Sequence, residues 1–383
     1  MKIDCIRTYH LRHVLSEPFG FSQMMVPARN VLLVEIIADD GTVGWGECYG
    51  PPEVYQAAIR SYYGPQLMGR DPRQIDVLWH AMWRTTLDFA RRGVMMGAMS
   101  GLDMALWDLK GKALGCPVWE LMGGRCADKL PCYATGMYFR DLPKAALIDA
   151  LIAEATGYRD QGFAGVKVKI GKTQAFDREL LRRVREALPE MRLFSDANHA
   201  YDLPGAIQIG RLLDELDYGW FEEPLSPEHP TMYRQLQQQL SLPLAAGECE
   251  QTRWGFQSLL AGGGVQIAQP DLAYCGGPSE ALKIRSIASS LGINVTPHVW
   301  GTMLNLAAAV HFHASGYREP GRADAAPLML ECDRSPNALR DELFEIPIHV
   351  EGGVAHVPTA PGLGVTVDRA AMNSFLVHGD EIR

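Results

Sequence analysis

Residues 165–171 read GVKVKIG, and three similar stretches follow: RLFSDAN at 192–198, WFEEP at 220–224 and PLAAGE at 243–248. Each is strand-like and carries an ionisable residue at or near its end, namely Lys169, Asp196, Glu222 and Glu248. The intervals are 196 − 169 = 27, 222 − 196 = 26 and 248 − 222 = 26 residues. A spacing of about 25 residues is one strand, one loop and one helix, the repeat of a (β/α)₈ barrel, whose active sites lie at the C-terminal strand ends. The four side chains are therefore expected to converge on one site.

The same pattern continues along the chain. Asp271 in IAQPD follows Glu248 by 23 residues, and His298 in NVTPH follows Asp271 by 27. From Leu130 onward, strand-like runs alternate with amphipathic stretches whose apolar residues recur about every 3.6 positions. The runs are LPCYATGM, GVKVKIG, LFSDAN, WFEEP, PLAAGE, VQIAQPD, INVTPH and LMLE. Because eight strands close a barrel, the predicted fold class is α/β, a (β/α)₈-type barrel or modified TIM barrel.

The first 128 residues do not follow this repeat. Residues 1–11 are typical of a strand, and residues 30–49 of a hairpin that turns at Asp40-Gly41. Three helical stretches follow, the last of which ends at Gly115 and Pro117. We therefore predict an α+β N-terminal capping domain over 1–128, a catalytic barrel over 129–349, and a C-terminal segment, 350–383, that returns to the cap.

Length, charge and composition limit the class of protein. A chain of 383 residues exceeds the size at which one core keeps growing, so two domains are expected. The formal charge of −9 and the lack of a basic run argue against nucleic-acid partners. The chain contains no run of 18 apolar residues, so no membrane-spanning helix is predicted. Eight cysteines without a CxxC pair, and a start that does not resemble a signal peptide, favour a reduced, cytoplasmic protein.

Asp196, Glu222 and Glu248 are predicted to present carboxylates toward one point from three adjacent strands. A single acidic residue at a strand end is more often a helix cap or a solvated charge. Three carboxylates at matching positions of adjacent strands repel one another unless a cation lies between them. Oxygen ligands select a hard divalent ion, so we predict Mg²⁺. Glu223 follows Glu222 directly and is expected to point to the other side of its strand, in a structural role.

Lys167 and Lys169 lie two residues apart in one strand, so their side chains share a face. A solvated edge strand is the alternative explanation. The apolar residues Val166, Val168 and Ile170 take the alternate positions and must pack against helices, which leaves the lysines facing the barrel interior. We expect two neighbouring ammonium groups to lower each other's pKa, which makes one of them a base near neutral pH.

His298 and Asp271 form a second predicted pair, on the opposite side of the ring from Lys169. A carboxylate that accepts from one imidazole nitrogen fixes the tautomer and raises the basicity of the other. A histidine without Asp271 would more often be structural. Two further residues lie near these strand ends: His199 is placed to reach the barrel mouth, and Cys249 is expected to have a packing role.

These motifs resemble those of the enolase superfamily, in its mandelate racemase-like subgroup. The matching segments run in family order and are KVKIG, SDANHAY, FEEP, AAGE, QPD and TPHVWGT. More narrowly, the hairpin DDGTVGWGEC, DANHAY, PHVWGT and ECDRSPN are similar to the galactarolactone cycloisomerase branch and related sugar-acid dehydratases. The cap-plus-barrel layout fits as well, so the resemblance covers nearly the whole chain.

The resemblance implies a role for each matching residue. Asp196, Glu222 and Glu248 become the Mg²⁺ ligands, and Lys169 becomes the base on one face of the substrate, modulated by Lys167. His298, oriented by Asp271, becomes the acid or base on the other face. Glu331 in LMLECD is implied to donate a hydrogen bond to the substrate carboxylate, and Asn198 to contact the substrate. Specificity is expected from cap loops at 17–25 and 47–52, with the candidates Phe19, Phe21, Gln23 and Tyr49.

The predicted function is abstraction of the proton α to a carboxylate, followed by β-elimination, on a sugar acid or its lactone. A divalent ion stabilises the enediolate formed in such a reaction. Three alternatives remain open: a racemase or epimerase of a 2-hydroxy acid, a Schiff-base aldolase with Lys169 as nucleophile, and a non-catalytic sugar-acid-binding barrel. The predicted binding partner is a small-molecule sugar acid or lactone. The resemblance implies a homo-oligomer, because members of the family commonly form homo-oligomers.

Overall fold

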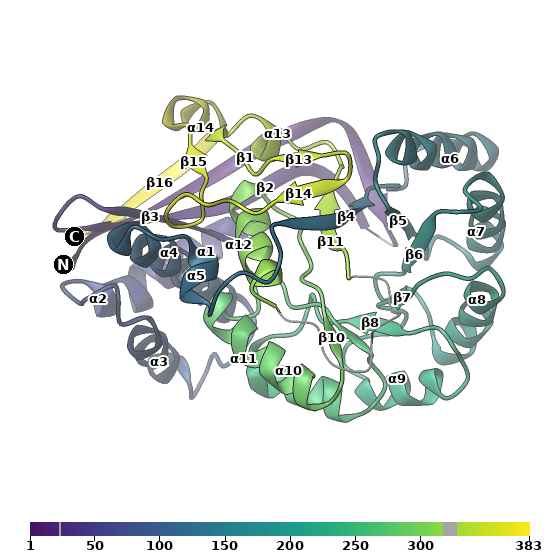
Figure 1. Ribbon diagram of the computed structural model, residues 1–383, viewed down its shortest axis with the longest axis horizontal. Coiled ribbons are helices and arrows are strands. Elements are labelled where there is room, and N and C mark those ends of the chain that lie inside the picture. Colours follow the sequence, from purple (N-terminus) through teal and green to yellow (C-terminus); the bar gives the residue numbers. More distant parts are fainter. Residues whose placement is uncertain (23, 317–327) are drawn as a thin grey trace.

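The computed structural model describes residues 1–22, 24–316 and 328–383. Figure 1 shows a part that contains both chain termini and, beside it, a ring of strands with helices outside. The first part is built mainly from the N-terminal residues and the second from the residues that follow β4 (Lys129–Thr135). This is the cap-plus-barrel arrangement that the change of sequence pattern after the cap predicts.

The cap contains an antiparallel sheet with the strand order β16-β1-β2-β3. These strands are β1 (Ile3–Phe21), β2 (Met24–Ala38), β3 (Val43–Cys48) and β16 (Leu376–Ile382). The turn between β2 and β3 lies at the predicted place, where Gly41 has a φ of 84°. β1 is longer than the predicted strand over 1–11, because pairing with β2 resumes at Phe19 after a register shift. The extension brings Gly20 to Phe139 of the barrel, and each backbone N–H donates to the other carbonyl at 2.7 Å.

The helices that pack on the cap sheet are α1 (Pro52–Ala58), the π-helical turn η1 (Ile59–Tyr63) and α4 (Val94–Leu114). α2 (Gly64–Leu67), α3 (Ile75–Thr86) and α5 (Val118–Leu121) pack against these helices. α4 lies directly against β3, and a Cβ on Gly46 would come within 2.0 Å of the Gly101 carbonyl oxygen. Small residues therefore permit the close approach. Gly115 ends α4 in the left-handed conformation, as the sequence predicts.

Eight parallel strands within the described residues form the barrel, at the eight predicted places. They are β4, β5 (Gly165–Lys169), β6 (Arg192–Asp196), β7 (Phe221–Glu222), β8 (Leu244–Ala246), β9 (Ile267–Ala268), β10 (Asn294–Val295) and β11 (Leu330–Asp333). The ladder runs from β10 through β4, and β11 pairs with β4 on its other side. The Thr296 hydroxyl links the two ends, since it donates to the Met329 carbonyl at 2.8 Å.

Outer helices connect successive barrel strands (Figure 1). They are α6 (Lys144–Asp160), α7 (Gln174–Ala187), α8 (Leu203–Glu215), α9 (Pro230–Gln237), α10 (Thr252–Ala261), α11 (Gly277–Ser290) and α12 (Met303–Ala314). Val166, Val168 and Ile170 of the β5 region are fully buried in the apolar core, as the alternation in that strand predicts. The lysines between them therefore face the interior of the ring.

The C-terminal residues contact both parts of the molecule. Their elements are α13 (Ala338–Asp341), β12 (Phe344–Ile346), β13 (Val350–Glu351), β14 (Val354–His356), β15 (Thr366–Val367) and α14 (Arg369–Phe375). β14 pairs antiparallel with β4 before β16 pairs with β1 in the cap sheet. The tail thus extends the barrel sheet as well as the cap sheet.

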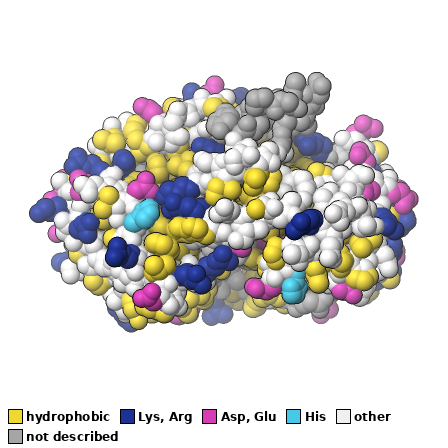
Figure 2. Space-filling view, turned by 90° about the horizontal axis from the view of Figure 1, so that it is seen from below, with side chains coloured by type: hydrophobic (Ala, Val, Ile, Leu, Met, Phe, Trp, Pro, Cys, Tyr) yellow, Lys and Arg dark blue, Asp and Glu magenta, His cyan; other side chains and the backbone are white. Residues whose placement is uncertain are grey.

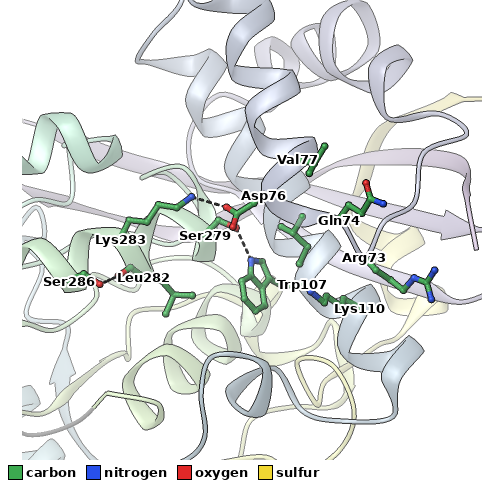
Figure 3. Close-up of a pocket in the computed structure, with 11 residues that line it drawn as sticks. Arg73, Gln74, Asp76, Val77, Trp107, Lys110, Ser279, Leu282, Lys283 and Ser286 are labelled. Atoms are coloured by element: carbon green, nitrogen blue, oxygen red, sulfur yellow. Dashed lines mark hydrogen bonds and ion pairs between the residues drawn. The ribbon is translucent and has the colours of Figure 1, made fainter.

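Polar contacts join the cap to the barrel between α3, α4 and α11 (Figure 3). The Trp107 indole N–H donates to the Ser279 hydroxyl at 2.9 Å, and the Lys283 Nζ lies 2.8 Å from the Asp76 carboxylate. Asp103 is fully buried and accepts from the backbone and the hydroxyl of Ser279, at 2.9 and 2.7 Å. A cavity of about 470 Å³ lies beside these residues, and the predicted catalytic side chains do not line it.

On the surface seen in Figure 2, acidic and basic side chains lie among apolar ones. Among the described residues, no helix combines the length and the apolar character that a bilayer crossing requires.

Candidate active site

Three predicted metal ligands meet at the C-terminal ends of β6, β7 and β8, which are neighbours in the sheet (Figure 1). Asp196 pairs with Glu222 across the β6–β7 ladder, and Glu248 follows β8 closely. All three are buried, and one carboxylate oxygen from each lies within 4.8 Å of the other two. The register of the parallel strands therefore produces the convergence that the 26-residue spacing predicts.

Nitrogen donors occupy two of the three carboxylates. Lys169 Nζ lies 2.5 Å from Asp196, and Lys167 Nζ lies 2.6 Å from Glu222. The other oxygen of Glu222 accepts from the Trp220 indole at 3.0 Å and from the Gln269 amide at 2.8 Å. The sequence analysis did not predict Trp220 or Gln269 as site residues. A tryptophan or a glutamine in a barrel strand does not by itself indicate a site.

The third carboxylate, that of Glu248, is less well satisfied. Its Oε2 atom is buried and accepts no hydrogen bond within the described part of the chain, and His298 Nε2 lies 3.4 Å away. An orphaned carboxylate oxygen beside two other carboxylates is a poor arrangement without a cation. The oxygen donor set and this unsatisfied atom both fit a hard divalent ion such as Mg²⁺.

The pKa values of the two lysines contradict the sequence-based expectation. Burial lowers the pKa of Lys169, but Asp196, Tyr138 and Glu248 together outweigh burial and the neighbouring Lys167, so the pKa is raised. Burial also acts on Lys167, and the charges of Glu222 and Glu331 raise its pKa well above the usual value. Lys167 does lower the pKa of Lys169 as expected, but the carboxylates around both lysines outweigh this effect, so neither lysine has the expected pKa near neutral. In this arrangement both lysines are ammonium groups that neutralise the ring of acids.

His298 and Asp271 lie as the sequence predicts, on neighbouring barrel units. His298 Nδ1 and the Asp271 carboxylate are 2.7 Å apart, and the Asn305 amide and the Ala273 N–H also donate to Asp271. Burial would lower the pKa of His298, but Glu248 and the hydrogen bond to Asp271 raise it to about 10. His298 Nε2 therefore carries a proton near neutral pH and faces the carboxylate cluster.

Glu331, on β11, is tied into the same network. Its carboxylate lies 2.7 Å from Lys167 Nζ and accepts from the Thr135 hydroxyl at 2.5 Å and the Val299 N–H at 2.8 Å. Burial raises its pKa, but Lys167 and His298 more than offset this and lower it. As arranged here Glu331 is a hydrogen-bond acceptor, and the donor role implied by the resemblance requires a proton.

All of the predicted substrate-contact residues except Gln23 lie within the described part of the chain. Asn198 Oδ1 accepts from Lys169 Nζ at 3.1 Å, and the Phe21 ring centroid lies 5.6 Å from the same ammonium. The Tyr49 ring lies 5.8 Å from the His298 ring. Phe19 packs on Tyr138, with ring centroids 4.5 Å apart. Gln23 lies outside the described residues.

Two aromatic residues at the site were not predicted. The Tyr138 ring lies 5.2 Å from Lys169 Nζ, and the Trp300 ring lies 5.9 Å from Tyr49. The Arg29 guanidinium stacks on Trp300 at 3.8 Å and forms an ion pair with Asp333 at 3.1 Å. Tyr138 and Trp300 each follow a predicted strand end by a few residues, which is the signal that would have identified them.

Glu223 does not point away from the site as predicted. β7 ends at Glu222, and Glu223 has a φ of 41°, so the strand alternation no longer applies to it. The buried carboxylate instead lies 3.0 Å from His199 Nε2, which is also 3.6 Å from Cys249 Sγ. Burial, Glu223 and Glu248 raise the pKa of the Cys249 thiol, so it is no activated nucleophile.

Comparison with known proteins agrees with this geometry. The family model of the mandelate racemase / muconate lactonizing enzyme N-terminal domain matches residues 5–123, and that of the enolase C-terminal domain-like family matches 150–371. D-galactarolactone cycloisomerase from Agrobacterium fabrum is 40% identical over 98% of this chain and 99% of its own. Arabinonate dehydratase from Saccharolobus solfataricus is 34% identical over 88% of each chain.

A solved structure shows the same fold. The 3,6-anhydro-D-galactonate cycloisomerase from Zobellia galactanivorans superimposes with a TM-score of 0.89 at 39% identity, over 99% of this chain and all of the other. Fold and site together define a cap-and-barrel enzyme with ionisable side chains gathered at the C-terminal ends of its barrel strands. The chain belongs to the enolase superfamily, in the mandelate racemase and muconate lactonizing enzyme group.

Proposed function

We propose that this enzyme removes the proton α to the carboxylate of a sugar acid or sugar-acid lactone and then expels a group from the β-carbon. The expelled group is a ring oxygen in a lactone cycloisomerase and a hydroxyl in a dehydratase. The relatives named above carry out reactions of both kinds. The observation that carries the proposal is that Lys169 and His298 both contact the carboxylate cluster, one at Asp196 and the other at Glu248.

Asp196, Glu222 and Glu248 are the proposed Mg²⁺ ligands. The ion supplies positive charge that stabilises the enediolate, as it does in the superfamily. Every other contribution comes from the chain. Lys167 balances the charge of Glu222 and Glu331, and the Trp220 and Gln269 donors fix the position of Glu222.

Lys169 and His298 are the proposed proton-transfer groups. Lys169 takes the α-proton as a neutral amine, so it must first give its own proton to solvent when its contact with Asp196 weakens. Asn198 orients the Lys169 nitrogen. His298 gives a proton to the leaving oxygen, which its raised pKa of about 10 permits near neutral pH. Asp271 positions His298 through Nδ1. The proposed substrate contacts are Asn198, Glu331, Phe21, Tyr49 and, outside the described residues, Gln23.

The aromatic rings at the site suggest how water is kept from the intermediate. Phe21, Tyr49, Tyr138 and Trp300 come from the cap and from the loops that follow barrel strands. Phe21 and Tyr138 lie over Lys169, Tyr49 lies beside His298, and Trp300 lies against Tyr49. A dry site strengthens charge interactions between the catalytic groups and the substrate.

The experiment is a screen of hexaric acids, aldonic acids and their lactones with Mg²⁺, for wild type, Lys169→Ala and His298→Asn. We expect turnover by the wild type and its loss in both variants. Lys144→Ala, at an exposed lysine of α6, is the matched control. Turnover near the wild-type level in both site variants would contradict the proposal.

A racemase or epimerase remains the second candidate, because two proton-transfer groups from different strands suit exchange at one carbon equally well. Reaction in heavy water separates the two functions. Deuterium incorporation with inversion and no elimination product supports the second candidate. A cytoplasmic location and a homo-oligomer are parts of the proposal that await fractionation and sedimentation measurements.

A further inference from the structure

Three residues beside the carboxylate cluster form a group that the proposed reaction does not use. They are His199, Glu223 and Cys249, and one potential ligand atom from each lies within 4.8 Å of the other two. They come from the same three strand ends as the predicted Mg²⁺ ligands: His199 follows Asp196 by three residues, and Glu223 and Cys249 directly follow Glu222 and Glu248.

The hydrogen bonds of His199 leave one of its nitrogens in an unusual position. Nδ1 lies 3.3 Å from the Leu225 carbonyl oxygen, which only accepts, so Nδ1 carries a proton. In the neutral ring, Nε2 is then an unprotonated acceptor. It faces the thiol of Cys249 at 3.6 Å and the carboxylate oxygen of Glu223 at 3.0 Å.

The Glu223 oxygen in this contact is itself unsatisfied. Glu223 is 2% exposed, and within the described residues its Oε2 accepts no hydrogen bond. A lone pair on Nε2 and a lone pair on Oε2 repel each other at this distance unless a proton or a metal cation lies between them. Burial of such an oxygen is costly, and a bound cation would satisfy both atoms.

We propose that His199, Glu223 and Cys249 bind a borderline-soft divalent ion of the zinc type, separate from the ion of the carboxylate cluster. Sulfur, imidazole nitrogen and carboxylate oxygen are ligands that zinc accepts together, whereas Mg²⁺ takes oxygen. On binding, the thiol loses its proton to solvent and the sulfur bonds to the metal. The fourth tetrahedral position is left for water.

The distances in the group suit that ion. A tetrahedral zinc with bonds of about 2.3 Å to sulfur and about 2.0 Å to nitrogen places the two atoms about 3.5 Å apart, and the observed separation is 3.6 Å. The same geometry places nitrogen and oxygen about 3.3 Å apart, so the observed 3.0 Å requires only a small shift. The side chain of Cys249 is exposed and His199 is partly exposed, so an ion has a path from solvent.

Cobalt(II) is the probe for the test, because a thiolate bound to it gives a charge-transfer absorption band in the near ultraviolet. Reduced full-length protein is titrated with Co²⁺ in excess Mg²⁺. We expect one equivalent of the band, and its displacement by Zn²⁺. The other cluster of potential ligands in the described residues, His349, Glu351 and His356, contains no cysteine and gives no such band.

Variants make the outcome specific. Cys249→Ser is expected to abolish the band and to weaken zinc binding by more than about 100-fold, beyond the usual effect of an outer-shell change. Cys126→Ser, at another exposed cysteine, is the matched control and is expected to retain the band. Asp196→Asn, which disrupts the carboxylate cluster and the proposed reaction, is also expected to retain it.

Three results would overturn the inference: no band in the wild type, a band that persists in Cys249→Ser, or its loss in Asp196→Asn. The last would mean that the thiolate belongs to the carboxylate site. Because the readout is absorption and not turnover, the inference and the proposed function fail independently.

Discussion

The barrel interior and the cap–barrel interface both bury carboxylates, but they surround them with different partners. In the barrel, Asp196, Glu222 and Glu331 lie 2.5–2.7 Å from lysine ammonium groups. At the interface, Asp103 accepts from Ser279, and Glu47 accepts from the backbone N–H groups of Thr302 and Asn305 and from the Thr302 hydroxyl.

The consequence is a difference in charge. Ammonium partners hold the pKa values of Asp196 and Glu331 below their usual range even though burial raises them. Glu222 differs: burial and the neighbouring acids raise its pKa to about 7 in spite of Lys167. Neutral donors do not compensate for burial at the interface, so the pKa values of Asp103 and Glu47 are each raised to about 7. Two nearby ammonium groups therefore offset the burial of Asp196, whereas Lys167 does not offset the burial of Glu222 and the charges of its acidic neighbours.

Removal of the barrel base is expected to have the largest effect. Lys169→Ala removes the proposed proton-transfer group and leaves Asp196 without its nearest ammonium. Loss of a general base typically lowers turnover by about 10²- to 10⁴-fold. Steady-state assays on the substrate found in the screen measure it. If kcat stays within a few-fold of wild type while Lys144→Ala behaves in the same way, the barrel carboxylates and lysines have no catalytic role.

Loss of a counter-charge tests the barrel side of the comparison through stability. Lys167→Met leaves Glu222 and Glu331 without the ammonium that both contact. Removal of one partner of a buried ion pair typically costs about 3–5 kcal/mol. Denaturant unfolding with a chelator measures the loss, and we expect Mg²⁺ to restore part of it. A variant as stable as the wild type in chelator would show that the lysine is not needed to balance the acids.

The interface side is tested by pH. The folded-state pKa values of Glu47 and Asp103 are raised from 4.5 and 3.8 to about 7, so their protonated forms favour the folded state. Their contribution is complete below about pH 4 and is lost as the pH rises toward about 7. One pKa unit corresponds to about 1.4 kcal/mol, so the loss is on the order of a few kcal/mol for each group.

Glu47→Gln and Asp103→Asn are the variants that isolate this effect. The free energy of unfolding is measured between pH 5 and pH 8, and the difference between wild type and variant is compared along the series. We expect the variants to become relatively more stable as the pH rises. A difference that does not change with pH would mean that neutral donors hold these acids ionised after all.

The smallest expected effect concerns a single neutral hydrogen bond at the same interface. Trp107→Phe removes the indole N–H that donates to Ser279 (Figure 3). The net contribution of such a bond is about 0.5–1.5 kcal/mol. Thermal unfolding measures it, with turnover expected to remain unchanged because the predicted catalytic side chains do not line the cavity beside Trp107. A loss of turnover would show that this interface positions the cap loops over the site.

The barrel and its polar strand ends were predictable because the strand–loop–helix repeat appears in the sequence as a regular spacing of similar segments. Every predicted strand is present, and Lys169, Asp196 and Glu222 lie beside one another because parallel register aligns equal positions in successive units. The Asp40-Gly41 turn and the end of α4 at Gly115 were also predictable, since both depend on local backbone conformation.

Other features depend on contacts between distant segments. The raised pKa values of Lys167 and Lys169 follow from short distances to carboxylates on β6, β7 and β11. The sequence predicts that these groups share a site but does not give those distances. Tyr138 and Trp300 reach the site from irregular segments after the strands, where no periodicity applies. The pairing of β14 with β4 joins residues more than 200 positions apart (354 − 131 = 223).

The sequence by itself thus determined the order of the elements, the barrel and the identity of the charged groups at the strand ends, because these depend on a repeat that a linear chain displays. Only the tertiary structure decided which charge lies against which. Glu223 illustrates the reason: one backbone angle after β7 turns its carboxylate from the expected far side toward His199 and Cys249. Electrostatic energies change over a few ångströms, and distances of that size are set by folding and not by spacing along the chain.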